Sequence, residues 1–425
     1  MSSYDKIYTI TEYDGFTRGI ASNEYVELPE KTFDDLESLI LTNNRETEVK
    51  AMEFLSLSAR RGVGKIITAR NYVGLISMSD GTVIEILPKI VGENIGGQET
   101  KQIFMEMLKT LKDVAFKDFN ISSLHVERLN LFEIFIRMFL EEVATLTKKG
   151  LKAAYTSIEE NERFYKGKLL VSRDIKHNII NKERFYVQYD DFNVNTPENR
   201  LIKATLELLY KRTIDSRNKQ TAGRLMNYFE SVGDSTCYDA DFSKCIASRS
   251  TTHYEKALSW CRIFIKGNSF TAFAGKEVAL ALLFPMEKIF ESFIGSKLRS
   301  HVGDGMKLHL QESKFSLFDN PNRAFALRPD FVLEANDRVV VLDTKWKLLS
   351  DNARNKGISQ SDMYQMYAYG KKYNAEKVIL LYPHSDNIGE REIRFASDDG
   401  VRVDVSMIDL MNVDENIADL LARVC

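Results

Sequence analysis

The chain has 425 residues, of which 44% are hydrophobic and 28% are charged, and this composition is typical of a soluble globular protein with two or three domains. Its net charge of −3 and pI of about 6.2 disfavour a protein that coats nucleic acid unaided, because neutralising phosphates needs clustered Lys and Arg. No apolar run reaches the roughly 18 residues of a membrane span, and the first residues lack the basic start and apolar core of a signal peptide, so we expect a cytoplasmic protein with no membrane partner.

The first segment, residues 1–98, has the pattern of a β-rich domain. Residues 72–79 and 82–87 are runs of alternating, β-branched side chains on either side of Asp80-Gly81. An Asp-Gly pair in this setting is typical of a tight hairpin turn. The sequence therefore predicts an antiparallel hairpin in this segment.

Residues 99–270 change to a helical period and are predicted to form a mainly helical middle region. One apolar stripe at helical spacing comprises Ile134, Phe135, Met138, Phe139 and Val143. Residues 199–211 form a second helix with an apolar side. Residues 166–168 and 190–199 are expected to be irregular connections.

The last segment, residues 271–425, combines apolar strands with helices. The apolar run 278–284 is at most a buried-helix candidate, and Pro285 suits the first turn of the helix after it. Further strands are predicted at 325–333, 339–345, 377–382, 391–395 and 401–407, with a helix near 360–372. This order predicts a mixed sheet with helices packed against it. The fold class is thus multi-domain α+β, with a β-rich N-terminal domain, a helical middle and an α/β C-terminal domain.

Two acids are brought together by the predicted turn at Asn336-Asp337. In a symmetric hairpin, residues equidistant from the turn face each other, and Asp330 and Asp343 are equidistant from this one. Their Cβ atoms are then about 4.5–5.5 Å apart. Two carboxylates this close repel each other, and a divalent cation between them relieves the repulsion. Such oxygen ligands suit Mg²⁺, which keeps several waters and a substrate phosphate in its shell.

Lys345 lies two residues beyond Asp343 and so points to the same face of the strand. There it can orient a metal-bound water and stabilise charge on a phosphate oxygen. The alternative is an ordinary exposed face on which the acids and the lysine pair. Against this alternative, Asp343 ends a strongly apolar strand. Burying a charge there costs free energy unless the charge is paired or binds a cation. The four cysteines form no CxxC pair, which disfavours a structural zinc site.

Four further polar residues have both a functional and a structural interpretation. Glu287 and Glu291 are one turn apart beside an apolar helix stripe, where they either present a carboxylate to the sheet or face solvent. Gln365 and Tyr369 share one helix face. They either hydrogen-bond phosphate or Lys345, or they belong to a helix that packs through its apolar side.

Pro329-Asp330 followed by Asp343-Thr344-Lys345 has the form of the PD-(D/E)xK nuclease motif. Flanking segments make the match more specific. They are Phe290-Glu291, Arg328-Pro329-Asp330, Leu342 to Lys347, Asp362 to Tyr369 and, upstream, residues 81–90 and 195–203. Together these segments resemble the McrC family, which supplies the nuclease subunit of the two-part McrBC restriction systems. Residues 1–70 and about 212–270 match nothing in that family.

The resemblance implies a role for each candidate site residue. The catalytic set is Asp330, Asp343, Lys345 and Glu291. The metal ligands are Asp330, Asp343 and the backbone carbonyl of Thr344, which are expected to bind Mg²⁺, with Mn²⁺ as a substitute. The supporting polar pair is Gln365 and Tyr369. The C-terminal domain, 271–425, is accordingly expected to be a PD-(D/E)xK nuclease domain like that of restriction endonucleases.

The resemblance also implies partners, namely double-stranded DNA and an McrB-like AAA+ GTPase hexamer, with residues 1–98 as the docking domain. The chain itself is expected to bind no nucleotide, because Arg60-Arg-Gly-Val-Gly-Lys65 lacks both the Walker spacing and the Ser or Thr that follows the lysine. The expected function is a DNA endonuclease subunit that defends against foreign DNA. Two alternatives remain, a non-catalytic adaptor that activates an AAA+ ring and holds DNA, and a stand-alone nuclease.

Overall fold

A computed structural model describes most of the chain. The described residues are 7–19, 24–42, 54–78, 80–90, 97–111, 129–245, 252–266, 278–303, 305–320, 322–335 and 338–424. The chain forms two compact units, of which the first contains residues 1–131 and 269–425 and the second residues 132–268. The three predicted segments do not map one to one onto these units, because the first and last segments belong to the same unit.

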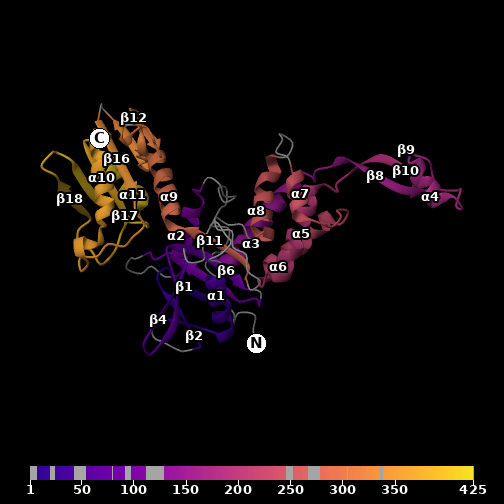
Figure 1. Cartoon of the computed structure of the whole chain (residues 1–425), viewed down its shortest axis with the longest axis horizontal. Helices are drawn as coiled ribbons and strands as arrows, with labels where there is room; N and C mark the ends of the chain where they lie inside the picture. Colours follow the sequence, from indigo (N-terminus) through magenta and orange to yellow (C-terminus); the bar gives the residue numbers. More distant parts are fainter. Residues whose placement is uncertain are drawn as a thin grey trace. The chain divides into compact units, whose positions relative to one another are not determined.

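The N-terminal part of the first unit contains two four-stranded sheets (Figure 1). The first has the order β1 (Ile7–Thr11), β7 (Val83–Leu87), β6 (Tyr72–Met78) and β11 (Val278–Pro285). The second has the order β3 (Val26–Leu28), β2 (Gly15–Arg18), β5 (Gly64–Ala69) and β4 (Leu55–Arg60). Helix α1 (Glu30–Thr42) contacts β2 and β4, and α2 (Gly97–Leu108) contacts β7. The predicted hairpin is confirmed, since β6 and β7 are antiparallel neighbours.

Strand β11 contradicts the buried-helix interpretation of residues 278–284. It pairs antiparallel with β6 and so completes a sheet whose other strands lie about 200 residues earlier in the chain. A short apolar run cannot be assigned to helix or strand from its periodicity, and here pairing with β6 decides. Gly74 permits the pairing, because a Cβ at this position would lie 1.9 Å from the Leu282 carbonyl oxygen.

The C-terminal part of the first unit is a six-stranded mixed sheet, as predicted. Its order is β12 (Met306–Leu310), β15 (Phe331–Ala335), β16 (Arg338–Thr344), β17 (Lys377–Pro383), β19 (Arg402–Ile408) and β18 (Glu392–Ala396). Strands β16, β17 and β19 are parallel, and the outer pairings are antiparallel. A small hairpin, β13 (Ser316–Phe318) with β14 (Ala324–Ala326), precedes β15, and a 3₁₀ turn (Arg354–Gly357) precedes the next helix.

Helices cover both faces of this sheet. Helix α10 (Gln360–Lys372) packs Met366 and Tyr369 against alternate residues of the central strands, including Val341 and Leu380. Helix α9 (Met286–His301) contacts β12 and β16, and α11 (Val413–Val424) contacts β19 and α9 (Figure 1). Strand residues alternate between faces, so odd-numbered residues of β16 point toward α10.

The second unit combines a helical core with a strand-rich arm. The core helices are α3 (Leu131–Lys148), α5 (Pro197–Arg212), α6 (Ser216–Met226), α7 (Tyr238–Lys244) and α8 (Glu255–Lys266), with 3₁₀ turns at Asn227–Phe229 and Thr252–Tyr254. The predicted stripe is buried here, and Phe135 and Phe139 contact the rings of Trp260 and Phe264. Among the described residues of the chain, no helix is long and apolar enough to cross a bilayer.

The arm consists of a three-stranded sheet and one helix between core helices α3 and α5. It is formed by β8 (Ala154–Glu162), β9 (Lys168–Leu169), α4 (Val171–Asn178) and β10 (Phe185–Asn193), with β10 in the middle of the sheet. The irregular connection predicted at 190–199 is therefore partly wrong, because β10 continues to Asn193 and α5 begins at Pro197. These strands were missed because β8 has no buried face and hence no apolar alternation.

Candidate active site

The carboxyl end of β16 brings the two predicted acids together. The register of β15 and β16 pairs Phe331 with Leu342 and Val332 with Val341, and one further step places Asp330 opposite Asp343. The predicted register is thus confirmed, although the turn at 336–337 lies outside the described residues. Because β16 is a central strand, only 2% of Asp343 is exposed.

Asp330 and Asp343 lie in different hydrogen-bonding environments. Oδ2 of Asp330 accepts hydrogen bonds from the backbone N–H of Thr344 at 2.7 Å and from its hydroxyl at 2.6 Å. Burial raises the pKa of Asp330, and these two bonds oppose the rise. Burial and the nearby Asp330 raise the pKa of Asp343 to about 7. The pair therefore carries unfavourable negative charge that a cation would neutralise.

Lys345 supplies the positive charge beside this pair. Its Nζ lies 2.5 Å from Oδ2 of Asp343 and 3.4 Å from Oε1 of Gln365. Burial by itself lowers the pKa of Lys345, but the attraction of Asp343 outweighs it and the net shift is upward. The amine is therefore charged at neutral pH and is aimed at the two acids.

Gln365 and Tyr369 extend the contact from the lysine into α10. Nε2 of Gln365 donates to the Tyr369 hydroxyl at 2.8 Å, which orients the amide so that its oxygen faces Lys345. Tyr369 is also part of the hydrophobic core. Gln365 thus makes the contact with Lys345 that the functional interpretation expects, and Tyr369 makes the packing contact that the structural interpretation expects; the functional role of the pair stays a prediction.

Glu291 lies close enough to the two aspartates for the charge of Asp330 to act on it. Its Oε1 accepts a hydrogen bond from Nε2 of Gln311 at 2.7 Å, and burial followed by the charge of Asp330 raises its pKa. Among the described residues, no three His, Cys, Asp or Glu side chains converge as ligands of one metal ion. The two sheet carboxylates still fit Mg²⁺, which needs only one or two protein carboxylates. Glu287 points elsewhere and hydrogen-bonds Asn71.

Two further residues near Lys345 were not predicted as site residues. Asp362 lies one helical turn before Gln365 on α10, and its negative charge acts on both Lys345 and Asp343. Tyr382, at the end of β17, is fully buried, and burial, Asp362 and Asp343 raise its pKa. The spacing of residues 362, 365 and 369 along one helix face could have indicated Asp362, whereas Tyr382 sits in a purely apolar run.

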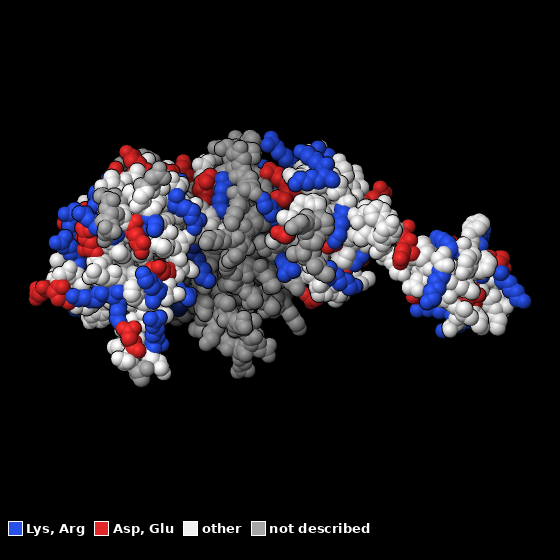
Figure 2. All heavy atoms as spheres, turned by 90° about the horizontal axis from the view of Figure 1, so that it is seen from above, with Lys and Arg blue, Asp and Glu red and all other residues white. Residues whose placement is uncertain are grey.

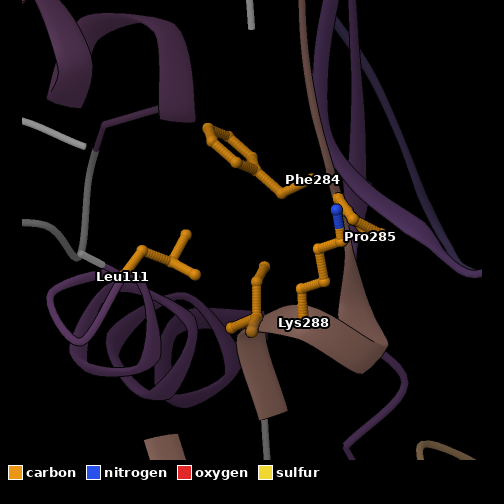
Figure 3. A pocket seen from close by; sticks show the side chains of 5 residues that line it. Leu111, Phe284, Pro285 and Lys288 are labelled. Atoms are coloured by element: carbon orange, nitrogen blue, oxygen red, sulfur yellow. The ribbon is translucent and has the colours of Figure 1, made fainter. Parts of the chain in front are cut away.

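A separate hollow lies where β11 meets α9 (Figure 3). It is lined by Leu111, Phe284, Pro285, Lys288 and Ile289, is open to solvent, and encloses no space large enough for a water molecule. Pockets for small ligands typically measure about 300–1,000 Å³. The hollow is too small for a nucleotide, and its lining includes none of the predicted site residues.

Comparison with known proteins places the chain in a family. Residues 67–383, more than half of the chain, match the family model described as "McrBC 5-methylcytosine restriction system component". The chain belongs to the McrBC family. It is 24% identical over 276 residues to the "Type IV methyl-directed restriction enzyme EcoKMcrBC" of Escherichia coli strain K12, and the match covers 60% of this chain and 78% of that protein.

Solved structures show that the fold is that of an McrBC component. The chain superposes with a TM-score of 0.71 and 19% identity on a chain of the Thermococcus gammatolerans assembly of McrB AAA+ hexamers with bound McrC, covering 99% of this chain and 100% of that one. A second structure, the McrBC complex of the same organism, matches with a TM-score of 0.51 and 22% identity over 70% of this chain and 88% of that one. The structural match to McrC agrees with the resemblance in the sequence.

Proposed function

We propose that this McrBC family member is the DNA endonuclease subunit of a two-component restriction system. The observation that carries the proposal is the buried Asp343 opposite the half-buried Asp330, with the Lys345 amine 2.5 Å from Asp343. Buried acids that repel each other are costly unless they are used. The proposed reaction is Mg²⁺-dependent hydrolysis of a phosphodiester bond in double-stranded DNA.

Each site residue has a proposed role that follows from its position. Asp330, Asp343 and the backbone carbonyl of Thr344 would hold Mg²⁺ or Mn²⁺, which supplies positive charge to the scissile phosphate and acidifies a bound water. Lys345 orients the attacking water and stabilises the charge that develops on the phosphate oxygens. Gln365 and Tyr369 hold the lysine amine in place. Glu291, directed to Gln311, completes the acidic side of the site as the PD-(D/E)xK resemblance implies.

The proposed partner is an McrB-like AAA+ GTPase hexamer, since the matched Thermococcus assembly contains McrB AAA+ hexamers. Docking through residues 1–98 remains a prediction. In the lobe at the right of Figure 2, which is the arm of the second unit, basic residues (blue) lie beside uncharged residues (white). The arm offers another surface, because many large apolar side chains are uncovered there. They are Tyr155, Phe164, Tyr165, Val171, Ile175, Ile179, Ile180 and Phe192. Such a patch on a soluble protein marks a protein contact.

Two alternatives remain. A non-catalytic adaptor would need no Lys345 directed at Asp343, so the intact set favours catalysis. A stand-alone nuclease would leave the uncovered apolar arm without a use, which favours a partner.

The test is cleavage of plasmid DNA with Mg²⁺ by the purified chain, alone and with an McrB-like AAA+ GTPase plus GTP. The proposal predicts cleavage only with partner, GTP and Mg²⁺. Cleavage by the chain alone would support a stand-alone nuclease, and stimulated GTP hydrolysis without cleavage would support the adaptor.

A further inference from the structure

Trp346, which directly follows the catalytic lysine, points away from Lys345. Lys345 contacts Gln365 on α10, whereas the Trp346 ring makes an edge contact with Phe290 on α9, with 5.3 Å between ring centroids. The indole is 6% exposed. The two side chains thus lie on opposite sides of the backbone. A contact that holds Trp346 in place therefore also holds the backbone from which the Lys345 side chain extends.

That anchor is a residue of the N-terminal segment. The indole Nε1 of Trp346 donates to Oε1 of Glu12 at 2.7 Å, across 334 positions of sequence. Oε1 also accepts from the backbone N–H of Lys89 at 2.9 Å. The backbone N–H of Glu12 donates to the Leu87 carbonyl at 2.9 Å, so Glu12 belongs to the ladder of β1 and β7. The catalytic strand end is therefore tied directly to the N-terminal sheet.

Burying the carboxylate of Glu12 at this position costs free energy. It is fully buried, and no group among the described residues hydrogen-bonds its Oε2. Burial raises the pKa of Glu12 to about 7, the bonds from Lys89 and Trp346 oppose the rise, and the charge of Glu287 adds to it. Tyr13 also faces Glu12, and burial followed by the charge of Glu12 raises its pKa to about 12. A neutral or apolar residue would be cheaper at this position, so stability alone does not explain the acid.

We propose that Glu12 is a positioning residue for the nuclease reaction. Through Trp346 it holds the backbone after β16 so that the Lys345 amine reaches Asp343, and it makes cleavage depend on the conformation of the N-terminal sheet. This inference rests on the proposed nuclease function. It also gives the N-terminal segment a direct route by which docking there would reach the catalytic lysine.

Four variants test the contact in the complete system with partner, GTP and Mg²⁺. E12A removes the acceptor, and W346F removes the donor but keeps a ring against Phe290. Misplacement of a catalytic group by about 1 Å can cost roughly 100-fold in rate, so each variant is expected to lower kcat by tenfold to 100-fold with little change in KM for DNA. The double variant should lose no more than the worse single one. E12Q keeps an acceptor oxygen and should retain most of the activity.

A matched control distinguishes positioning from general damage to the N-terminal sheet. Glu85 on β7 is 1% exposed and bonds Thr9, Lys101 and the backbone N–H of Leu131, and none of these bonds reaches the segment around Lys345. E85A should lower the melting temperature but leave kcat of the folded protein close to that of the wild type. An equal loss of kcat in E85A and E12A would overturn the inference.

Fluorescence provides a readout that needs no cleavage. The chain has two tryptophans, so the difference between wild-type and W346F spectra reports Trp346. We expect this difference emission to shift with pH around the Glu12 pKa and to stay flat in E12Q. A flat wild-type profile, or wild-type kcat in folded E12A and W346F, would overturn the positioning role while the nuclease stands. A wild-type protein that does not cleave DNA under any condition would remove the proposed function and this inference with it.

Discussion

At the end of β16, charged side chains are buried, whereas in the arm of the second unit apolar side chains are exposed. Asp343 is 2% exposed and lies beside Asp330, and its counter-charge is the Lys345 amine. On the arm, Phe164 and Ile180 are 80% and 88% exposed. Both regions depart from the usual distribution of polar and apolar groups.

The end of β16 and the arm differ in the kind of partner that would lower their free energy. The two aspartates need positive charge, which a small cation can bring. The exposed apolar surface needs another apolar surface, which only a macromolecule of matching shape can bring. The first region is therefore suited to chemistry and the second to assembly, and each can be altered without touching the other.

A large effect is expected from removing the positive charge of Lys345. Substituting Lys345→Met should lower the cleavage rate by about 10²–10³-fold, which is typical for the loss of one group that stabilises transition-state charge. The matched control is Lys377→Met, which removes the partner of Asp404 at 3.5 Å in the same sheet. Single-turnover cleavage measures both. Equal rates in the two variants would remove Lys345 from the mechanism.

A second prediction concerns stability as a function of pH. The pKa of Glu12 rises from 4.5 to about 7 on folding, so the folded protein keeps a proton that the unfolded chain releases, and the free energy of unfolding falls as pH rises. At about 1.4 kcal/mol per pKa unit, the loss between pH 4.5 and 8 is about 3 kcal/mol. E12Q does not titrate, so its stability relative to the wild type should increase over this range. Urea unfolding at several pH values measures it, and parallel curves would contradict the assigned pKa.

The exposed surface of the arm should matter for assembly only. Burying one large apolar side chain is worth about 2 kcal/mol, so Phe164→Ser or Ile180→Ser should weaken partner binding by roughly 30-fold. Met411→Ser, at another exposed apolar residue, is the control. Leu41→Ser on α1 tests the predicted docking through residues 1–98. If only the α1 variant weakens binding in a pull-down titration, the arm is not the docking surface.

The smallest expected effect concerns the polar pair on α10. Tyr369→Phe removes the hydroxyl that orients Gln365, and we expect the cleavage rate to fall about tenfold, near the low end for a positioning group. Tyr373→Phe is a matched control. Tyr373 directly follows α10, and its hydroxyl donates a hydrogen bond to the Glu312 carbonyl at 3.2 Å. A loss in both variants alike would indicate that packing of α10, rather than orientation of Lys345, is affected.

The sequence predicts those parts of the site that local geometry determines. A hairpin register follows from distances to its turn, which places Asp330 opposite Asp343, and the strand period of two places Lys345 beside them. Helical spacing of four predicts the contact of Gln365 with Tyr369. Each of these rules relates residues within one or two elements.

The parts that could not be predicted depend on contacts between distant segments. Nothing near Glu12 indicates that it will bond Trp346, and nothing near 278–284 indicates that this run will pair with β6. The arm was missed for a different reason, because strands without a buried face lack the apolar alternation that reveals strands. Glu291 was predicted in the site from its helix face and from the family resemblance, and the charges of Asp330 and Lys345 act on it; its role in the site stays a prediction, because helix periodicity does not give the distance from the helix to the two aspartates.

The most direct test of the central claim compares two buried aspartates of the same sheet. Asp343 and Asp404 are 2% and 8% exposed, and each lies next to one lysine. The measurement is Mg²⁺-dependent plasmid cleavage by D343N and D404N, each with the AAA+ partner and GTP, after both variants are shown to fold and to bind the partner. We predict that D343N abolishes cleavage while D404N cleaves at nearly the wild-type rate. Cleavage by folded D343N at the rate of D404N would contradict the assignment of the end of β16 as the active site.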